Sequence, residues 1–262
     1  MKRLIKKTRD AVFSSLKRPL EFVFSIESAI TRTWAKNAHK RLMIAQWGLG
    51  TNPEWFDHNI DHYYQWHQTG NSLWLERGIF SGVCLKQGGD VLELCCGDGY
   101  NAGNFYSHKT RTVTACDFDI SAIKSAQKNW RRPNLEFTVA DIRTQMPSGK
   151  YDNIIWDAAI EHFTESEIEK LMKDIKVRMK PGSVLSGYTI VERDDGTKHI
   201  HQHEYEFQSK EDLMRFLEPH FVHVVVFETF YPSRHNLYFW ASDDDSQIPF
   251  NRHWEAMCTS TK

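Results

Sequence analysis

Two glycines separated by one residue follow a short apolar segment and have an acidic residue upstream. In the stretch DVLELCCGDGYNAGNF, residues 90–105, Gly97 and Gly99 come after the apolar run and Glu93 stands within it. Glycine adopts positive φ and lets backbone N–H groups approach a ligand closely, where a Cβ would intervene. The helix expected after this turn points its N-terminus at the same place. The stretch therefore predicts a turn that holds a nucleotide-like ligand.

Two more acids end later apolar segments. Asp117 closes RTVTACD 18 residues after Gly99 (117 − 99 = 18), about where a carboxylate accepts the hydroxyls of a ribose. Asp141 closes LEFTVAD and is placed to accept the exocyclic amine of an adenine. Glycines and acids at three successive strand ends predict one composite ligand site.

Histidines supply the candidate bases, because imidazole is the side chain that titrates nearest neutral pH. The segment DAAIEHF, residues 157–163, places Glu161 and His162 just after a predicted strand. In HIHQHEYEF, His199, His201 and His203 recur at a period of two, which predicts one face of one strand. Such a face is explained by a solvated edge strand, by a wall of the active site or by metal ligation, and we carry His201 and His203 forward as candidate catalytic residues.

The elements that must position these residues alternate between strand and helix from about residue 88, which is typical of a doubly wound sheet. The predicted strands are 90–95, 111–117, 135–141, 151–157, 221–228 and 236–242. In addition, 180–192 is predicted to be a turn and a strand, and 194–207 a tight turn that leads into a returning strand with the histidines at 199–203. Thr164 and Glu167 predict a capping box, and Ser209 caps a later helix. The predicted organisation is a helical extension and lid over 1–87, a catalytic domain over 88–245, and a tail over 246–262.

The combination resembles the class I S-adenosylmethionine-dependent methyltransferases over roughly residues 88–241. The family turn reads acid, x, small, x, Gly, x, Gly, and here it is Glu93-Leu94-Cys95-Cys96-Gly97-Asp98-Gly99. As in the family, acidic residues also close the second and third strands, and the fourth strand, YDNIIWD, is rich in acids. The turn MKPGSVL and the final strand NLYFWAS resemble the family as well. Cys95 replaces the usual first glycine. The resemblance implies a Rossmann-like seven-stranded sheet with an antiparallel last strand.

The resemblance also implies how S-adenosylmethionine would be held and S-adenosylhomocysteine released. The methionine part is assigned to Glu93, Cys95, Gly97 and Gly99. The ribose is assigned to Asp117 and the adenine to Phe118, Asp141 and Ile142. Asp157 and Ala158 would line the far side, and Arg77 would pair with the carboxylate of the donor.

A divalent metal is an alternative element of the site. Ubiquinone-pathway O-methyltransferases and small-RNA 2′-hydroxyl methyltransferases are similar in carrying Glu-x-x-Glu-His after the fourth strand, which binds a divalent ion. Here Ala158 stands at the first glutamate and Asp157 one position before it. Glu161, His162 and one of His201 or His203 would form a carboxylate–imidazole site.

The acceptor is expected to lie under the aromatic upstream segment. Aromatic faces suit sugar rings and planar small molecules, and the candidates are Tyr63, Tyr64, Trp66 and Trp74. The formal net charge of −1 argues against a nucleic acid acceptor, which favours a basic surface. We therefore expect O-methylation of a polar small molecule, a sugar or a glycan hydroxyl, with histidine as the base.

The first residues, MKRLIKKTRDAVFSSLKR, predict a basic helix that would contact an anionic membrane surface, the domain itself or a second copy of the chain. The five cysteines lack a CxxC pair and predict reduced thiols in a cytoplasmic protein.

Two alternatives to the methyltransferase remain. Gly97-x-Gly99-x-x-Ala102 satisfies the dinucleotide fingerprint, so a nicotinamide-dependent oxidoreductase is one, although no Tyr-x-x-x-Lys follows. A non-catalytic binding protein that docks through the basic helix is the other.

Overall fold

The computed structural model describes residues 2–47, 57–58, 61–62, 73–231 and 234–249. The chain divides into two compact units, Met1–Thr51 and Asn52–Lys262. This division falls earlier than the boundary predicted at residue 87. Most of the helix predicted after Pro53 lies outside the described residues, as do residues 250–262 of the predicted tail.

The first unit contains one long helix, α1 (Lys2–Trp47), which includes Pro19. Its 11 basic and 3 acidic residues give it a formal charge of 11 − 3 = +8. Large apolar side chains are exposed along it, among them Phe22 at 66%, Ile30 at 65% and Trp34 at 67%. Among the described residues, no helix combines the length and hydropathy that crossing a bilayer requires.

The second unit is built on a seven-stranded sheet in the order β3-β2-β1-β4-β5-β7-β6. The strands are β1 (Asp90–Leu94), β2 (Thr112–Asp117), β3 (Leu135–Val139), β4 (Tyr151–Asp157), β5 (Met179–Ile190), β6 (His223–Tyr231) and β7 (Arg234–Ser242). The pairings among β1 to β5 are parallel, whereas β7 runs antiparallel to both β5 and β6. The predicted doubly wound sheet with an antiparallel last strand is confirmed.

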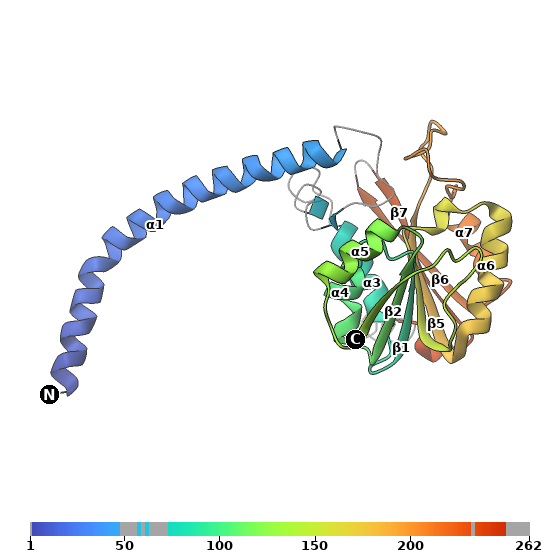
Figure 1. Ribbon diagram of the computed structural model, residues 1–262, viewed down its shortest axis with the longest axis horizontal. Helices are drawn as coiled ribbons and strands as arrows, with labels where there is room; N and C mark the ends of the chain where they lie inside the picture. Colours follow the sequence, from blue (N-terminus) through green and yellow to red (C-terminus); the bar gives the residue numbers. More distant parts are fainter. Residues whose placement is uncertain (1, 48–56, 59–60, 63–72, 232–233, 250–262) are drawn as a thin grey trace, which may run out of the picture. The chain divides into compact units, whose positions relative to one another are not determined.

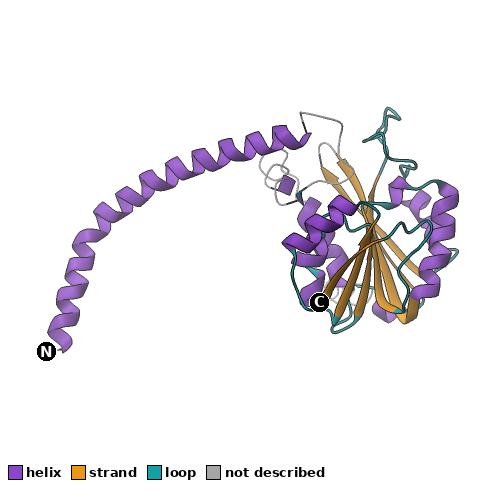
Figure 2. Ribbon diagram, in the orientation of Figure 1, coloured by secondary structure: helices purple, strands orange, loops and turns teal. Residues whose placement is uncertain are grey.

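Helices cover both faces of this sheet (Figures 1 and 2). They are α3 (Leu73–Val83), α4 (Tyr100–Asn104), α5 (Ile120–Asn129), α6 (Glu165–Arg178) and α7 (Lys210–Leu217), with short 3₁₀ turns η1 (Tyr106–His108), η2 (Ile160–His162) and η3 (Asp245–Gln247). The predicted capping box is present, since the Thr164 hydroxyl accepts from the Glu167 amide and the Glu167 carboxylate accepts from the Thr164 amide. Ser209 caps α7 as predicted.

The core follows the alternation of side chains along the central strands. Leu92 and Leu94 of β1 pack with Trp156 of β4 in the cluster beneath α6 and α7. Val91 and Ile155 point to the opposite face and pack in the cluster that includes α5. Both faces of the central strands are buried, so apolar residues occupy consecutive positions in them, as Val91 and Leu92 do in β1 and Ile154 and Ile155 do in β4.

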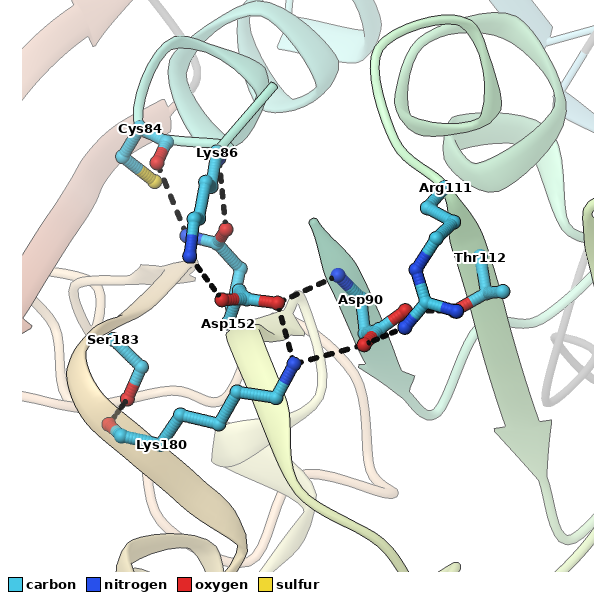
Figure 3. Close-up of polar contacts among 9 residues, drawn as sticks. Cys84, Lys86, Asp90, Arg111, Thr112, Asp152, Lys180 and Ser183 are labelled. Atoms are coloured by element: carbon cyan, nitrogen blue, oxygen red, sulfur yellow. Dashed lines mark hydrogen bonds and ion pairs between the residues drawn. The ribbon is translucent and has the colours of Figure 1, made fainter. Parts of the chain in front are cut away.

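A network of charges ties together the amino-terminal ends of the central strands, at the edge opposite the glycine turn (Figure 3). Asp152 on β4 accepts from the Asp90 amide at 2.9 Å and pairs with Lys86 and Lys180, each at 2.7 Å. Lys180 also pairs with Asp90 at 2.8 Å, and Arg111 bonds to the same carboxylate. Burial raises the pKa of Asp152, but the Asp90 amide and the two lysines outweigh it and lower the pKa below its ordinary value.

Replacing Asp152 with asparagine is expected to reduce the free energy of unfolding by about 2 kcal/mol near neutral pH, the range for hydrogen bonds to charged groups. A depressed carboxyl pKa stabilises the fold above the unfolded pKa of about 3.9, and the contribution is lost as the pH falls through the lower folded value. The difference between wild type and Asp152→Asn should therefore persist from neutral pH to about pH 4 and shrink below it.

Urea unfolding of both proteins across this pH range measures the difference. Glu169→Gln, at an exposed position on α6, is the matched control and should differ little from wild type at any pH. A difference that stays constant in acid would show that the charge of Asp152 is not the source of the stabilisation.

Candidate active site

The glycine turn lies at the carboxyl ends of the parallel strands, beside the point where the chain changes direction across the sheet. β1 lies between β2 and β4, and the strands that follow β1 in sequence build outward on both sides of it. In open α/β sheets, ligands bind in the crevice outside the strand ends at such a switch point. The sheet topology thus brings the ends of β1, β2 and β4 together.

Three residues of the turn have positive φ, and their surroundings differ. Gly97 has φ 53° and an added Cβ would meet nothing within 4 Å, so the chain is open to a ligand there. Gly99 has φ 72° and an added Cβ would lie 2.5 Å from the Phe137 ring, so this position is constrained by packing. Cys95, in place of the family glycine, also has a positive φ of 55°. A side chain in this conformation stores backbone strain, which concentrates at functional sites.

Asp117 connects the end of β2 to the turn. Its Oδ2 accepts from the Gly97 amide at 2.9 Å and its Oδ1 accepts from the Asp119 amide at 2.9 Å. The adjacent Phe118 is half exposed. These bonds hold the carboxylate at the mouth of the turn, where the sequence predicted the ribose contact.

Asp141 and Ile142 follow β3. Arg143 pairs with the Asp141 carboxylate through its Nε at 2.9 Å and its Nη2 at 2.9 Å, and this hydrogen bonding lowers the pKa of Asp141. Ile142 is buried in the core cluster beneath α6. An adenine amine at Asp141 would share the carboxylate with Arg143.

A buried cluster of charges lies behind the turn. Arg77 on α3 donates from Nε to Asp157 Oδ2 at 2.8 Å, and Asn101 donates to the same oxygen at 2.8 Å. Burial alone would lower the pKa of Arg77, but Asp157 raises it above its ordinary value. Burial raises the pKa of Asp157, and Arg77 opposes that shift. Arg77, predicted to bind the donor, is thus joined to Asp157, another predicted donor residue.

Two carboxylate oxygens in this region are buried without a hydrogen bond among the described residues, Glu93 Oε2 and Asp157 Oδ1. Burial, together with the charge of Asp157, raises the pKa of Glu93 well above its ordinary value. Buried carboxylates are costly unless they are paired. A cationic ligand is the chemistry that this arrangement accommodates.

The described cysteines are free thiols set in or beside the core, as predicted for Cys95, Cys96 and Cys116. Burial raises the pKa of the Cys116 thiol to about 12 and that of Cys95 well above its ordinary value. Neither is suited to act as a nucleophile near neutral pH.

Three of the predicted catalytic residues meet. Ligand atoms of Glu161, His162 and His203 all lie within 4.8 Å of one another. The rings of His162 and His203 are perpendicular, with centroids 4.8 Å apart. Glu161 and His203 are buried, and His162 is partly exposed.

The strand predicted for 199–207 is absent, and this corrects the expectation that three histidines share one face. The segment is a loop in which only Phe207 pairs with Val191. His199 and His203 both turn toward one carboxylate, Glu206, which a period-two strand could not allow. His201 is exposed on the loop and lies outside the cluster. Of the two alternatives, His203 is therefore the histidine that joins Glu161 and His162.

The predicted acceptor residues Tyr63, Tyr64 and Trp66 lie outside the described residues, as does the side chain of Trp74. From the same segment, His58 Nδ1 lies 2.8 Å from Asp98 Oδ1, and its ring stacks on Tyr100 at 5.2 Å. This contact was not predicted from the sequence, nor were the contacts of Glu206 and Thr189. No local sequence motif predicts the contact between His58 and Asp98, because 40 residues separate them.

Comparison with known proteins finds a family model that matches part of the chain. Residues 91–182 match the family model of the methyltransferase domain. None of the curated proteins compared with the chain matches it.

Solved structures show the same fold. A TehB-like SAM-dependent methyltransferase from Corynebacterium glutamicum is 14% identical, covering 83% of this chain and 100% of that one, with a TM-score of 0.51. The N-methyltransferase NodS from Bradyrhizobium japonicum is 14% identical over 63% of this chain and 90% of its own, with a TM-score of 0.51. Human N-acetylserotonin methyltransferase in complex with SAM is 13% identical, covering 66% of this chain and 53% of its own, with a TM-score of 0.50.

Residues 91–182 are thus similar to a methyltransferase domain, and the sheet has the fold of the solved methyltransferases. The match begins in β1 and ends in the turn of β5, so it includes every strand end that carries a predicted donor residue. The three solved structures have different acceptors or none in their names, so the fold leaves the acceptor open.

Proposed function

We propose that this protein is an S-adenosylmethionine-dependent methyltransferase that methylates a hydroxyl group of a polar small molecule or sugar. The observation that carries the donor is the pair of buried carboxylate oxygens, Glu93 Oε2 and Asp157 Oδ1, beside a glycine turn with open space at Gly97. S-adenosylmethionine carries an ammonium and a sulfonium group, which would compensate these carboxylates.

The donor residues are proposed as follows. Glu93 would take the ammonium group, Gly97 would let the chain approach the methionine part, and Asp117 would accept the ribose hydroxyls. Phe118, with Asp141 and Ile142, would contain the adenine. Asp157, held by Arg77, would face the same pocket together with Ala158. Since Arg77 is committed to Asp157, we assign it to positioning that carboxylate.

When bound, S-adenosylmethionine supplies an electrophilic methyl group, and transfer is an in-line displacement. The chain must align the acceptor oxygen and remove its proton. We assign proton removal to the cluster of Glu161, His162 and His203, which begins four residues beyond Asp157 (161 − 157 = 4). The imidazoles of that cluster are the reason for favouring a hydroxyl acceptor.

The class of acceptor rests on charge and on the aromatic segment near residue 64. The formal net charge of −1 disfavours a polyanionic acceptor. Tyr63, Tyr64, Trp66 and Trp74 remain the proposed contacts for a sugar or planar ring.

Isotope-labelled S-adenosylmethionine tests the proposal. The full chain is incubated with the labelled donor and a panel of sugars, nucleotide sugars and phenols, and methylated products are identified by mass spectrometry. A methylated hydroxyl product that is lost in His162→Gln supports the assignment. Methylation confined to amines or carboxylates would contradict the hydroxyl acceptor.

We also propose that α1 binds an anionic lipid surface. Its formal charge of +8 and exposed Phe22, Ile30 and Trp34 fit a helix that lies at the interface. Each basic residue near such a surface contributes about 1 kcal/mol, so reversing Arg32 and Lys36 to glutamate should weaken binding at least 10-fold.

Co-sedimentation with phosphatidylglycerol vesicles measures this affinity, and phosphatidylcholine vesicles are the control. Binding should decline with added salt, because the attraction is screened. Formation of a dimer in sedimentation velocity, without vesicle binding, would contradict the proposal and assign the helix to a second copy of the chain.

A further inference from the structure

We propose that Glu161, His162 and His203 form a binding site for one divalent transition-metal ion. The site itself stands on the geometry of these side chains, and its role in catalysis rests on the proposed methyltransferase function.

The ligand atoms converge from two segments far apart in the sequence. Glu161 and His162 lie on η2, while His203 lies on the loop after β5, and one ligand atom of each lies within 4.8 Å of the others. The loop is tied to η2 because the Glu161 carbonyl accepts from the amides of Glu204 and Tyr205, at 2.8 and 3.1 Å. The distance between the ligands is therefore fixed by the backbone and does not depend on long side chains meeting by chance.

Neighbouring residues orient two of the three ligands. Glu206 bonds to His203 Nδ1, which leaves Nε2 as the ring nitrogen for an ion. Thr189 on β5 donates to Glu161 Oε2 at 3.0 Å, which leaves Oε1 for the ion. His199 bonds the other oxygen of Glu206 at 3.1 Å and so fixes that carboxylate in turn. Metal-binding histidines are generally held in this way by a carboxylate on the second nitrogen.

The donor set selects the kind of ion. Two imidazoles and one carboxylate suit Zn²⁺, Fe²⁺, Co²⁺ or Mn²⁺, whereas Mg²⁺ and Ca²⁺ prefer oxygen ligands alone. Three protein ligands leave coordination positions open, which distinguishes a catalytic site from a closed structural one. His162 is partly exposed, so the open side can be reached from solvent.

The open positions would take the acceptor hydroxyl. A divalent ion held by these residues would supply Lewis-acid chemistry that lowers the pKa of a bound hydroxyl, and the proton would leave to solvent water. The new O–CH₃ bond then forms as the S–CH₃ bond breaks, and its electron pair returns to sulfur, so the sulfonium becomes a thioether. In this arrangement the cluster of Glu161, His162 and His203 would still promote removal of the proton, with His162 acting through the bound ion as one of its ligands.

Titration of the full chain with Co²⁺ tests the site without an activity assay. The protein is prepared without a histidine tag, stripped with EDTA, and followed by visible absorption and calorimetry. We expect one ion per chain, displaced by Zn²⁺. His162→Gln and His203→Gln should each weaken binding at least 100-fold, whereas His201→Gln, on the exposed part of the same loop, should leave it unchanged.

Glu206→Gln tests positioning, because it keeps the three ligands and removes the carboxylate that orients His203. Loss of such a partner lowers metal affinity by about 10- to 100-fold. Thermal melts of every variant establish that it is folded. If His203→Gln fails to fold, the partly exposed His162→Gln still decides the outcome.

Absence of Co²⁺ binding to the wild-type chain, or equal binding by wild type and His162→Gln, would overturn the site. Titration of the same preparations with S-adenosylhomocysteine separates this result from failure of the proposed function. Binding of S-adenosylhomocysteine without Co²⁺ binding rejects the metal alone. Binding of Co²⁺ without S-adenosylhomocysteine binding keeps the site and rejects its role in methyl transfer.

Discussion

Replacing Asp117 with asparagine is expected to weaken S-adenosylhomocysteine binding by about 100-fold, equivalent to about 3 kcal/mol. In the wild-type protein the Asp117 carboxylate accepts hydrogen bonds from the amides of Gly97 and Asp119. In our proposal it also accepts from the ribose hydroxyls. An asparagine side chain retains only one acceptor oxygen. Its NH₂ group would face an N–H or O–H donor that the second carboxylate oxygen now accepts from, and two donors cannot form a hydrogen bond. Both the turn and the ribose contact lose a charge-assisted partner at once.

Calorimetric titration with S-adenosylhomocysteine measures the loss, and NAD serves as the control ligand. Asp195→Asn, at an exposed turn, is the matched control variant and should bind as wild type does. Asp141→Asn should have a smaller effect than Asp117→Asn, because Arg143 already occupies the Asp141 carboxylate. A folded Asp117→Asn protein with unchanged affinity would remove Asp117 from the site, and binding of NAD alone would reject the methyltransferase assignment.

Replacing Gly187 with alanine is expected to cost about 3 kcal/mol or more in stability, because the added methyl group overpacks the centre of the sheet. Gly187 lies on β5 opposite Trp156 of β4. Its Cβ would lie 2.0 Å from the Trp156 carbonyl oxygen and 2.5 Å from the Phe239 ring. A backbone oxygen cannot rotate away as a side chain does, so the two strands must separate.

Urea unfolding measures this cost, with Gly82→Ala as the matched control. Gly82 lies in α3, where an added Cβ meets nothing within 4 Å. The control should be stabilised by about 0.5–1 kcal/mol, since alanine restricts the unfolded chain more than glycine does. Because β5 also carries Thr189 beside Glu161, a folded Gly187→Ala protein should bind Co²⁺ more weakly. Equal stability of the two variants would show that the strands adapt.

The positions of the residues proposed to hold the donor could be predicted from the sequence because they lie in short contiguous motifs at strand ends. Glu93, Gly97 and Gly99 belong to one turn, and Asp117 ends the next strand. Parallel strands that are buried on both faces align their carboxyl ends at one edge of the sheet, so residues separated in sequence meet there without further information. The capping box at Thr164 was predictable for the same reason, since it depends on residues three apart.

Tertiary structure determines where the histidines of the loop after β5 lie. A period of two predicted a histidine strand between 199 and 207, but the buried carboxylate of Glu206 draws His199 and His203 inward and the segment turns back on itself. Likewise, Arg77 meets Asp157 across 80 residues. A buried charge must find a partner wherever the fold provides one, and that requirement outweighs local periodicity. The sequence alone thus determined the fold class and the position of the glycine turn, whereas long-range packing determined which histidines lie together and which residue pairs with Arg77.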